Sequence, residues 1–444
     1  MTIKLRKSER DTYFAFFLST TIWFTPLRTF AIEVGDILHS GIGRPISKIM
    51  ILCFLIYTFI PFYNYVRVKK WDAIIFIFIL IQWFRSLVFH VDYAGNYISI
   101  LLDFLIKCVP FYFIAGNTIN WKLVKEYFYK AGTISIFLMF GLTLIKERFG
   151  GGIFNDADKY SMFYGLLIGR SVIVKCIEFF DTKKFRVLLL FILSIGLMIL
   201  YGTRTPIVCV AFLLFLFFIK KVANYIKDGK IIIRYNSWKL VFAFIILLVI
   251  GSAFIIVTRA RTMDTMDPGE RILYTISNGK FFKSEGRLNI FNAAKQVILE
   301  HPLLGTGLIG DRIGIVKALG VSVDDFTGYY AHNLFVEFIL QTGIIVGAGL
   351  TILVLLFCFN GLFRTFNDDK YLIYMYLISF GVGSLMLSGT AIRVAEFWIF
   401  LSMGIRDLLE RYGNNMRKNY LRNVKMDIDQ FETKRTEFYS IRKD

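Results

Sequence analysis

The chain has 444 residues, of which 56% are hydrophobic and 17% are aromatic. Soluble domains contain roughly 45–50% apolar residues, so this composition excludes an ordinary soluble protein and indicates a polytopic, all-α membrane protein. The formal net charge of +19 does not indicate a nucleic-acid partner, because the basic residues lie in short segments between apolar runs. That distribution is typical of the cytoplasmic loops of a protein embedded in membrane lipid.

Twelve apolar segments approach the length of about 20 residues that a membrane-spanning helix needs. They are centred on residues 13–31, 46–65, 73–89, 98–116, 131–146, 161–180, 186–202, 206–219, 240–258, 343–363, 371–388 and 394–409. The first follows a basic run, contains Pro26 and Arg28 and has no small-residue cleavage site, so we interpret it as a retained span. With a cytoplasmic N-terminus, the loops rich in Lys and Arg fall on the cytoplasmic side, and so does the C-terminus.

This topology divides the chain into four parts. Residues 1–258 hold nine spans, residues 259–342 form one long loop outside the membrane, residues 343–409 hold three spans, and residues 410–444 are a basic cytoplasmic tail. The long loop is polar and carries Arg287, His301 and His332, so we expect the chemistry there. The five cysteines lie in apolar segments without a C-x-x-C pair, which indicates neither disulfides nor a metal site.

Three separated positions put a cation or an imidazole at the predicted outer face. Arg204 lies between the seventh and eighth spans, Arg287 lies in the long loop, and His332 lies where that loop re-enters the membrane. An arginine can bind two phosphate oxygens at once, and an imidazole can accept a proton near neutral pH. Each residue alone also fits an ordinary role as a snorkelling cation, a surface charge or an interfacial histidine. Together they favour a site for an anionic, phosphorylated lipid substrate.

The segment that follows Arg287 has apolar residues at a helical spacing. Those residues are Leu288, Phe291, Ala294, Val297 and Ile298. They predict an amphipathic helix along the membrane, which ends before Pro302 because proline cannot continue a helix. The glycines of the next stretch, L-L-G-T-G-L-I-G, permit tight turns, and Gly343 and Gly347 permit the close approach of another helix.

Ionisable residues inside the predicted spans are few, and a charge at the centre of a bilayer costs at least about 2.5 kcal/mol. Arg170 is the deepest of them, and its position fits equally a structural partner or the lining of a polar substrate cavity. Asp103 and Lys107 are four residues apart and can neutralise each other on one helical face. Asn333 and Glu337 have the same spacing and can hydrogen-bond along theirs.

Three motifs, in this order, resemble those of the O-antigen ligase and polymerase superfamily. Y-G-T-R-T-P-I-V-C-V resembles the family's S/T-R-T/A entry to a middle span, and E-G-R-L-N-I-F-N-A-A followed by E-H-P-L-L-G-T-G resembles its G-R…P-x-x-G-x-G loop. H-N-L-F-V-E-F-I-L-Q-T-G-I-I-V-G resembles its H-N-x-x-x-E…G-x-x-G element. The resemblance covers roughly residues 147–409, and one departure is Phe291, where the family often has tryptophan.

The resemblance implies a membrane glycosyltransferase of the GT-C architecture that uses no metal or other cofactor and takes its glycan from undecaprenyl diphosphate. Carried over by position, Arg204 and Arg287 would hold the diphosphate, and His332 would orient or deprotonate the acceptor hydroxyl. Asn333 and Glu337 would support His332, and with Arg170 they form the predicted substrate-binding group. If His332 must be neutral, activity should fall as the pH drops through about 6.5, the ordinary pKa of imidazole.

We therefore expect a Wzy-type polymerase for O-antigen or capsular polysaccharide, in the bacterial inner (cytoplasmic) membrane, with its site facing outward. The same chemistry with lipid A core as the acceptor would make the chain an O-antigen ligase of lipopolysaccharide biosynthesis. A transporter or flippase for the lipid-linked glycan is the third alternative, although the sequence shows no internal repeat of the kind found in transporters. The polymerase interpretation implies a chain-length regulator and a separate flippase as protein partners.

Overall fold

The computed structural model describes residues 7–37, 42–149, 162–201, 204–227, 285–322, 326, 328–364 and 368–411. Within these ranges the chain forms helices and short turns and contains no strand, which confirms the all-α prediction. Five described helices are long and apolar enough to cross a membrane: Lys70–Phe89, Val91–Asn117, Trp121–Lys146, Thr205–Val222 and Ile344–Leu362. They indicate a membrane protein. The count of twelve spans stays a prediction, and the predicted span 240–258 lies outside the described residues.

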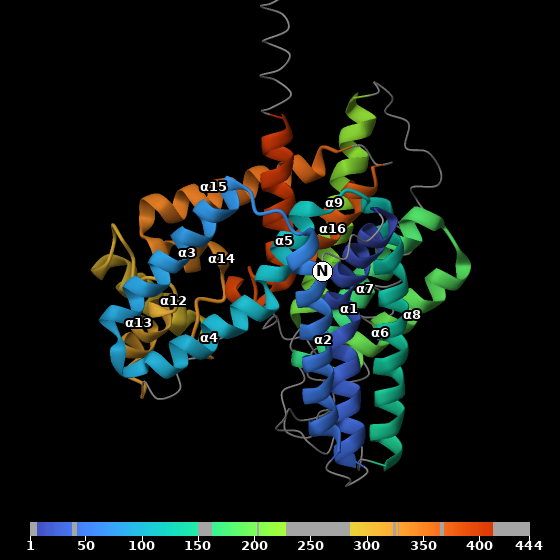
Figure 1. Ribbon diagram of the computed structural model, residues 1–444, viewed down its shortest axis with the longest axis horizontal. Coiled ribbons are helices and arrows are strands. Elements are labelled where there is room, and N and C mark those ends of the chain that lie inside the picture. Colours follow the sequence, from blue (N-terminus) through green and yellow to red (C-terminus); the bar gives the residue numbers. More distant parts are fainter. Residues whose placement is uncertain are drawn as a thin grey trace, which may run out of the picture.

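Six helices of the N-terminal half form one bundle (Figure 1). These helices are α1 (Lys7–Ile37), α2 (Gly43–Tyr65), α6 (Trp121–Phe149), α7 (Met162–Thr182), α8 (Phe185–Leu200) and α9 (Arg204–Lys227). α1 packs along α2 and α6, and α7 packs on α6, α8 and α9. Aromatic side chains fill the contacts of α1, where Phe14 and Phe17 are 1% and 0% exposed. The burial of these rings stabilises the bundle by removing apolar surface from its surroundings.

A second group of helices lies beside the bundle and contains the described residues of the long loop, from Glu285 onward (Figure 1). Its helices are α3 (Lys70–Phe89), α4 (Ala94–Lys107), α12 (Glu285–Glu300), α13 (Gly310–Leu319), α14 (Leu334–Thr342) and α15 (Ile344–Leu362). α12 packs on α13 and α14, and α14 packs on α15. The short helix η1 (Val91–Tyr93) joins α3 to α4, and α5 (Val109–Asn117) follows α4 and contacts α1.

The C-terminal part of α3 holds the turns of the long loop. The Arg85 guanidinium donates hydrogen bonds to the carbonyl oxygens of Leu304 at 2.6 Å and Gln341 at 3.1 Å. The backbone N–H of Leu308 donates to the carbonyl oxygen of Gln82 at 3.2 Å. One arginine therefore ties the turn after α12 to the end of α14, which fixes the loop on an apolar helix.

The glycine-rich turns predicted for this region are present. Gly305 has φ +63°, and a Cβ atom there would lie 2.5 Å from the carbonyl oxygen of Leu340. A Cβ atom on Gly347 would lie 2.6 Å from the Cα of Ile339, so this glycine lets α15 approach α14 closely. The close approach predicted for this position is confirmed, and the helix concerned is the one that directly precedes α15.

The amphipathic helix predicted after Arg287 is α12, which ends at Glu300, before Pro302. Its buried face differs in part from the predicted one. Ala294 and Val297 are 1% and 2% exposed, as expected, whereas Leu288 is 61% exposed. The difference arises because α13 and α14 cover only one side of α12, and the sequence alone does not specify which side.

The C-terminal helices are interrupted by irregular backbone. α16 (Asp369–Tyr376) continues as a π-helical segment, η4 (Leu377–Val382), and turns then lead to the short helix η5 (Ala391–Arg393) and a helix over residues 395–411. The continuous helix predicted over 371–388 is therefore broken. Non-helical backbone within a membrane protein needs protein partners for its polar groups, and the carbonyl oxygen of Leu385 accepts from the N–H of Leu334 at 3.1 Å.

Two ion pairs, one partly exposed and one buried, neutralise charged side chains on the helices. The predicted pair of Asp103 and Lys107 is confirmed at 2.8 Å, with side chains that are 36% and 52% exposed. A second pair, Asp72 on α3 and Arg406 in the last helix, lies 2.7 Å apart with side chains that are 0% and 8% exposed. The hydroxyl of Tyr112 donates to the same Asp72 carboxylate at 2.9 Å.

Replacing Asp72 with asparagine should destabilise the protein by about 3–5 kcal/mol, because it leaves the buried Arg406 cation without its carboxylate. Asp103→Asn is the matched control, since an exposed pair contributes only about 0–1 kcal/mol. Thermal unfolding of both purified variants in detergent measures the difference. Equal unfolding temperatures for the two variants would contradict this account of the buried pair.

Candidate active site

His332 lies in the turn directly before α14, in a strained backbone conformation. Its φ is +51°, a left-handed value that costs a non-glycine residue roughly 1–2 kcal/mol. Its ring is half-buried and 4.2 Å from the ring of Tyr330, centroid to centroid. Its Nδ1 atom is buried and has no hydrogen-bond partner among the described residues. Strain of this kind at a loop residue with an unused polar atom is typical of functional sites.

Arg287 and His332 act on each other electrostatically, although they are far apart in sequence. Arg287 lies in the first turn of α12, is half-buried, and α12 packs on α14. Burial, and secondly the charge of Arg287, lower the pKa of His332 to about 4. The imidazole is therefore neutral at physiological pH, with a guanidinium cation nearby.

Arg204 is the first residue of α9. The next residue, Thr205, connects this helix to the turn that carries His332. The Thr205 hydroxyl lies 3.1 Å from the Ser388 hydroxyl. The carbonyl oxygen of Ser388 accepts a hydrogen bond from the Tyr330 hydroxyl at 3.2 Å. The start of α9, the turn at Ser388 and the segment that carries His332 are thus joined by polar contacts, so the regions of Arg204 and His332 meet.

Asn333 and Glu337, predicted to bond each other along one helical face, have separate partners. The Asn333 side chain caps α14 by accepting hydrogen bonds from the backbone N–H groups of Phe335 and Val336. The Glu337 carboxylate is buried and accepts from the Thr390 hydroxyl at 2.6 Å. Both residues therefore fix the position of α14 behind His332, and their substrate-binding role stays a prediction.

A buried polar cluster lies behind the His332 turn and was not predicted from the sequence. It consists of Asp311, Arg312, Glu337, Gln341 and Thr390. Gln341 donates to Asp311 at 3.3 Å and to Glu337 at 3.2 Å, and Arg312 donates to the Thr390 hydroxyl at 3.3 Å. Burial raises the pKa of both carboxyl groups, and the Asp311 charge raises that of Glu337 further. The cluster therefore holds less negative charge than two free carboxylates would.

Tyr330 is the second residue that the sequence analysis missed. The Arg312 guanidinium lies 5.7 Å from the centroid of its ring, and the His332 ring contacts the same tyrosine. Only the two neighbouring tyrosines two and three residues before His332 could have drawn attention to this position. Tyr330 links the imidazole to the buried cluster.

Arg170, predicted to bind substrate, is paired with Glu396. Its Nε donates to the Glu396 carboxylate at 2.5 Å, and its guanidinium lies 4.8 Å from the centroid of the Phe380 ring. The Glu396 side chain is 0% exposed. This pair supports the structural partner that the sequence left open, and a direct role of Arg170 in substrate binding stays a prediction.

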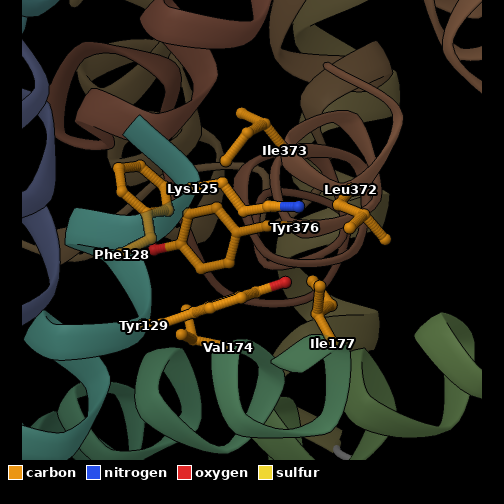
Figure 2. A pocket seen from close by; sticks show the side chains of 8 residues that line it. All are labelled: Lys125, Phe128, Tyr129, Val174, Ile177, Leu372, Ile373 and Tyr376. Atoms are coloured by element: carbon orange, nitrogen blue, oxygen red, sulfur yellow. The ribbon is translucent and has the colours of Figure 1, made fainter. Parts of the chain in front are cut away.

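A small cavity lies between α6, α7 and α16 (Figure 2). It is lined by Lys125, Phe128, Tyr129, Val174, Ile177, Leu372, Ile373 and Tyr376. None of the predicted site residues lines it. In the described part of the chain, no group of three or more His, Cys, Asp or Glu side chains is arranged to hold a metal ion.

The comparison with protein families matches the region that contains this site. Residues 189–351 match the model of the family described as O-antigen ligase. No curated protein and no solved structure matches the chain. The matched region contains Arg204, Arg287 and His332, the residues on which the sequence resemblance depended. Residues 189–351 are therefore similar to the O-antigen ligase family, and this match supports the resemblance of the chain to the O-antigen polymerase and ligase superfamily.

Proposed function

We propose that this chain is a polymerase that joins undecaprenyl-diphosphate-linked oligosaccharide repeat units on the outer side of the bacterial cytoplasmic membrane. The family match supports a membrane enzyme of the glycosyltransferase type in polysaccharide biosynthesis. The observation that carries the proposed glycosyl transfer, for either acceptor, is the neutral His332 imidazole near the Arg287 cation. One group can accept a proton while the other binds a phosphate.

The proposed reaction is a direct displacement at the anomeric carbon of the donor. The His332 imidazole accepts the proton of the acceptor hydroxyl, and the hydroxyl oxygen forms the new bond to that carbon. The bond from the carbon to the phosphate oxygen breaks, and its electron pair leaves with the lipid diphosphate. Arg287, and Arg204 at the start of α9, bind the diphosphate and stabilise its charge. In this scheme the arginines neutralise the charge of the leaving diphosphate, as a metal ion does in many enzymes that act on phosphates.

The charge balance around the site supports an anionic donor. Arg287 and Arg312 both act on Tyr330, next to His332. The nearby carboxyls, Asp311 and Glu337, are buried and hydrogen-bonded within the cluster, and burial raises their pKa. Because burial reduces the negative charge of these carboxyls, they offset less of the arginine charge near His332, which favours the binding of phosphate.

Binding of the donor should also raise the pKa of His332, the proposed general base. A lowered pKa makes the His332 imidazole a weak base in the free enzyme, because burial and Arg287 both disfavour its charged form. A bound diphosphate brings negative charge beside the imidazole and neutralises Arg287. The pKa of His332 should then rise toward the working pH, where general-base catalysis is most efficient.

The pH dependence of kcat/KM should differ from that of an enzyme whose catalytic histidine has its ordinary pKa. Because the free enzyme keeps His332 neutral down to a pKa of about 4, kcat/KM should stay level from pH 8 to about 5 and fall below that. This replaces the fall near 6.5 expected from sequence. Rate measurements in proteoliposomes test this pH dependence. The control variant, His301→Ala, should have the same pH profile as the wild type. A wild-type profile centred near 6.5 would contradict the lowered pKa.

The proposal extends to the surroundings of the enzyme. It includes the GT-C architecture with about twelve spans, both termini in the cytoplasm, and the substrate-bearing loop outside. A chain-length regulator and a flippase would be its protein partners. Support comes from the five apolar helices and from the polar long loop that carries Arg287 and His332.

A deletion strain tests the polymerase proposal. Cells that lack the chain should make surface glycan of a single repeat, and wild-type complementation should restore a ladder of lengths. Complementation with His332→Ala, with membrane expression confirmed, should leave single repeats. Normal long glycans in the clean deletion would refute the proposal.

The ligase alternative has one specific observation in its favour, since the matched family is described as O-antigen ligase. A ligase acts after polymerisation, so its deletion should leave long glycans attached to the lipid carrier while the surface polymer disappears. The same deletion strain therefore separates the two, when lipid-linked and surface glycans are extracted and compared.

A further inference from the structure

Arg393 lies next to the candidate site but belongs to none of the three motifs. It is the last residue of η5, the short helix that follows the irregular turns after η4. Its side chain is exposed, whereas its neighbours Ala391 and Ile392 are 7% and 3% exposed. A single exposed guanidinium thus projects from an otherwise buried turn.

The turn that carries Arg393 is held in place from two sides. Glu337 accepts hydrogen bonds from the Thr390 hydroxyl at 2.6 Å and from the Ala391 N–H at 3.4 Å. The carbonyl oxygen of Ala391 accepts from the indole N–H of Trp398 at 2.7 Å. The position of the Arg393 backbone is therefore fixed, so binding an anion there requires little further ordering of the main chain.

The turn that carries Arg393 lies against the buried cluster, because Thr390 and Ala391 both donate to Glu337. The charge of Arg393 is near enough to Tyr330 and Arg312 to act on the pKa of both. Tyr330 in turn contacts the His332 ring at 4.2 Å. Arg393, on η5, thus adds to the positive potential that Arg287 supplies from α12.

Two other arginines of the C-terminal part, Arg364 and Arg406, are neutralised within the protein, but Arg393 is not. Arg364 and Arg406 each form an ion pair with an aspartate. In the part of the chain that the structure describes, no ion pair or hydrogen bond joins the Arg393 guanidinium to another side chain. Glu396, one turn later, is paired with Arg170. An exposed arginine without a carboxylate partner is available to bind an external anion through charge-assisted hydrogen bonds.

We propose that Arg393 is a third cation of the site and binds a phosphate oxyanion of the lipid-linked donor. This inference rests on the proposed function and deepens it, because it assigns a residue outside the three motifs to the diphosphate. Bilayer phospholipids also present phosphate oxyanions. The test therefore compares the two sources.

The test measures binding of undecaprenyl diphosphate to the purified full-length protein in detergent. Arg393→Gln should weaken binding by about tenfold or more, because a charge-assisted hydrogen bond to phosphate is lost. Arg393→Lys should lose less, since it keeps the charge without the bidentate geometry. Binding of undecaprenol, which has no phosphate, should not change. Arg10→Gln, which removes a partly exposed arginine at the start of α1, should bind as wild type does.

Two outcomes would overturn the inference. One is unchanged binding of undecaprenyl diphosphate by Arg393→Gln. The other is an equal loss of phosphatidylglycerol binding, which would assign Arg393 to bilayer lipid. Arg287→Gln separates this inference from the proposed function: if only that variant binds weakly, Arg393 is not a donor ligand and the function stands. If neither variant weakens binding, the proposed function itself fails.

Discussion

Replacing His332 with alanine should lower the rate of glycan transfer by about 10²–10⁴-fold, the usual contribution of a general base. The imidazole is half-buried and its Nδ1 has no hydrogen-bond partner among the described residues, so the main loss on removal is chemical rather than structural. The change should appear in kcat, with little change in the affinity for undecaprenyl diphosphate, because the proposed proton transfer occurs after binding. Single-turnover rates with purified protein measure it.

His301→Ala is the matched control, because His301 is an exposed histidine of the same loop, just after α12. It should keep the wild-type rate. An equal loss in both variants would point to a damaged loop rather than to a missing base. A His332→Ala variant with the wild-type rate would remove His332 from the mechanism altogether.

Replacing Arg287 with alanine should lower kcat/KM by about 10²–10³-fold, the cost of removing one group that stabilises developing charge. The variant should have a second signature. Since Arg287 helps to lower the pKa of His332, after burial, its removal should move the acidic fall of the pH profile upward from about 4, toward the ordinary value of imidazole. A purely structural arginine would lower the rate without moving the profile.

Lys295→Ala is the control for Arg287→Ala, because Lys295 is an exposed cation on the same helix. Arg287→Lys should recover part of the lost rate but not all of it, since an ammonium cannot form the bidentate contact with phosphate. Equal effects of Arg287→Ala and Lys295→Ala on rate would show that only the net charge of α12 matters.

The helical architecture followed from the sequence because apolar runs and Pro302 specify helices and their ends locally. The pair of Asp103 and Lys107 was predictable for the same reason, since both lie on one helix. The buried face of α12 was only partly predictable, because it depends on how α13 and α14 pack against it. The break between η4 and η5 begins at Gly383, earlier than the predicted end of the span at residue 388, and was missed because the apolar residues 385–387 make this stretch resemble the rest of the span.

The candidate site shows the same division. Arg287 and His332 could be singled out from motifs, and the structure brings them into electrostatic contact. Tyr330 and Thr390 could not, because their contacts join segments far apart in the chain. Local spacing also misled for Glu337, whose carboxylate bonds to Thr390 and Gln341 rather than to the side chain of Asn333. Pairing across segments depends on packing, which no local pattern encodes.

The most direct test of the central proposal uses purified full-length protein in proteoliposomes. The substrate is the lipid-linked oligosaccharide that accumulates in the deletion strain, and mass spectrometry follows the products. We expect longer glycans on undecaprenyl diphosphate, one carrier lipid released for each new linkage, and neither product with His332→Ala. Oligosaccharide that crosses the bilayer and stays a single repeat would contradict glycosyl transfer and would identify a transporter instead.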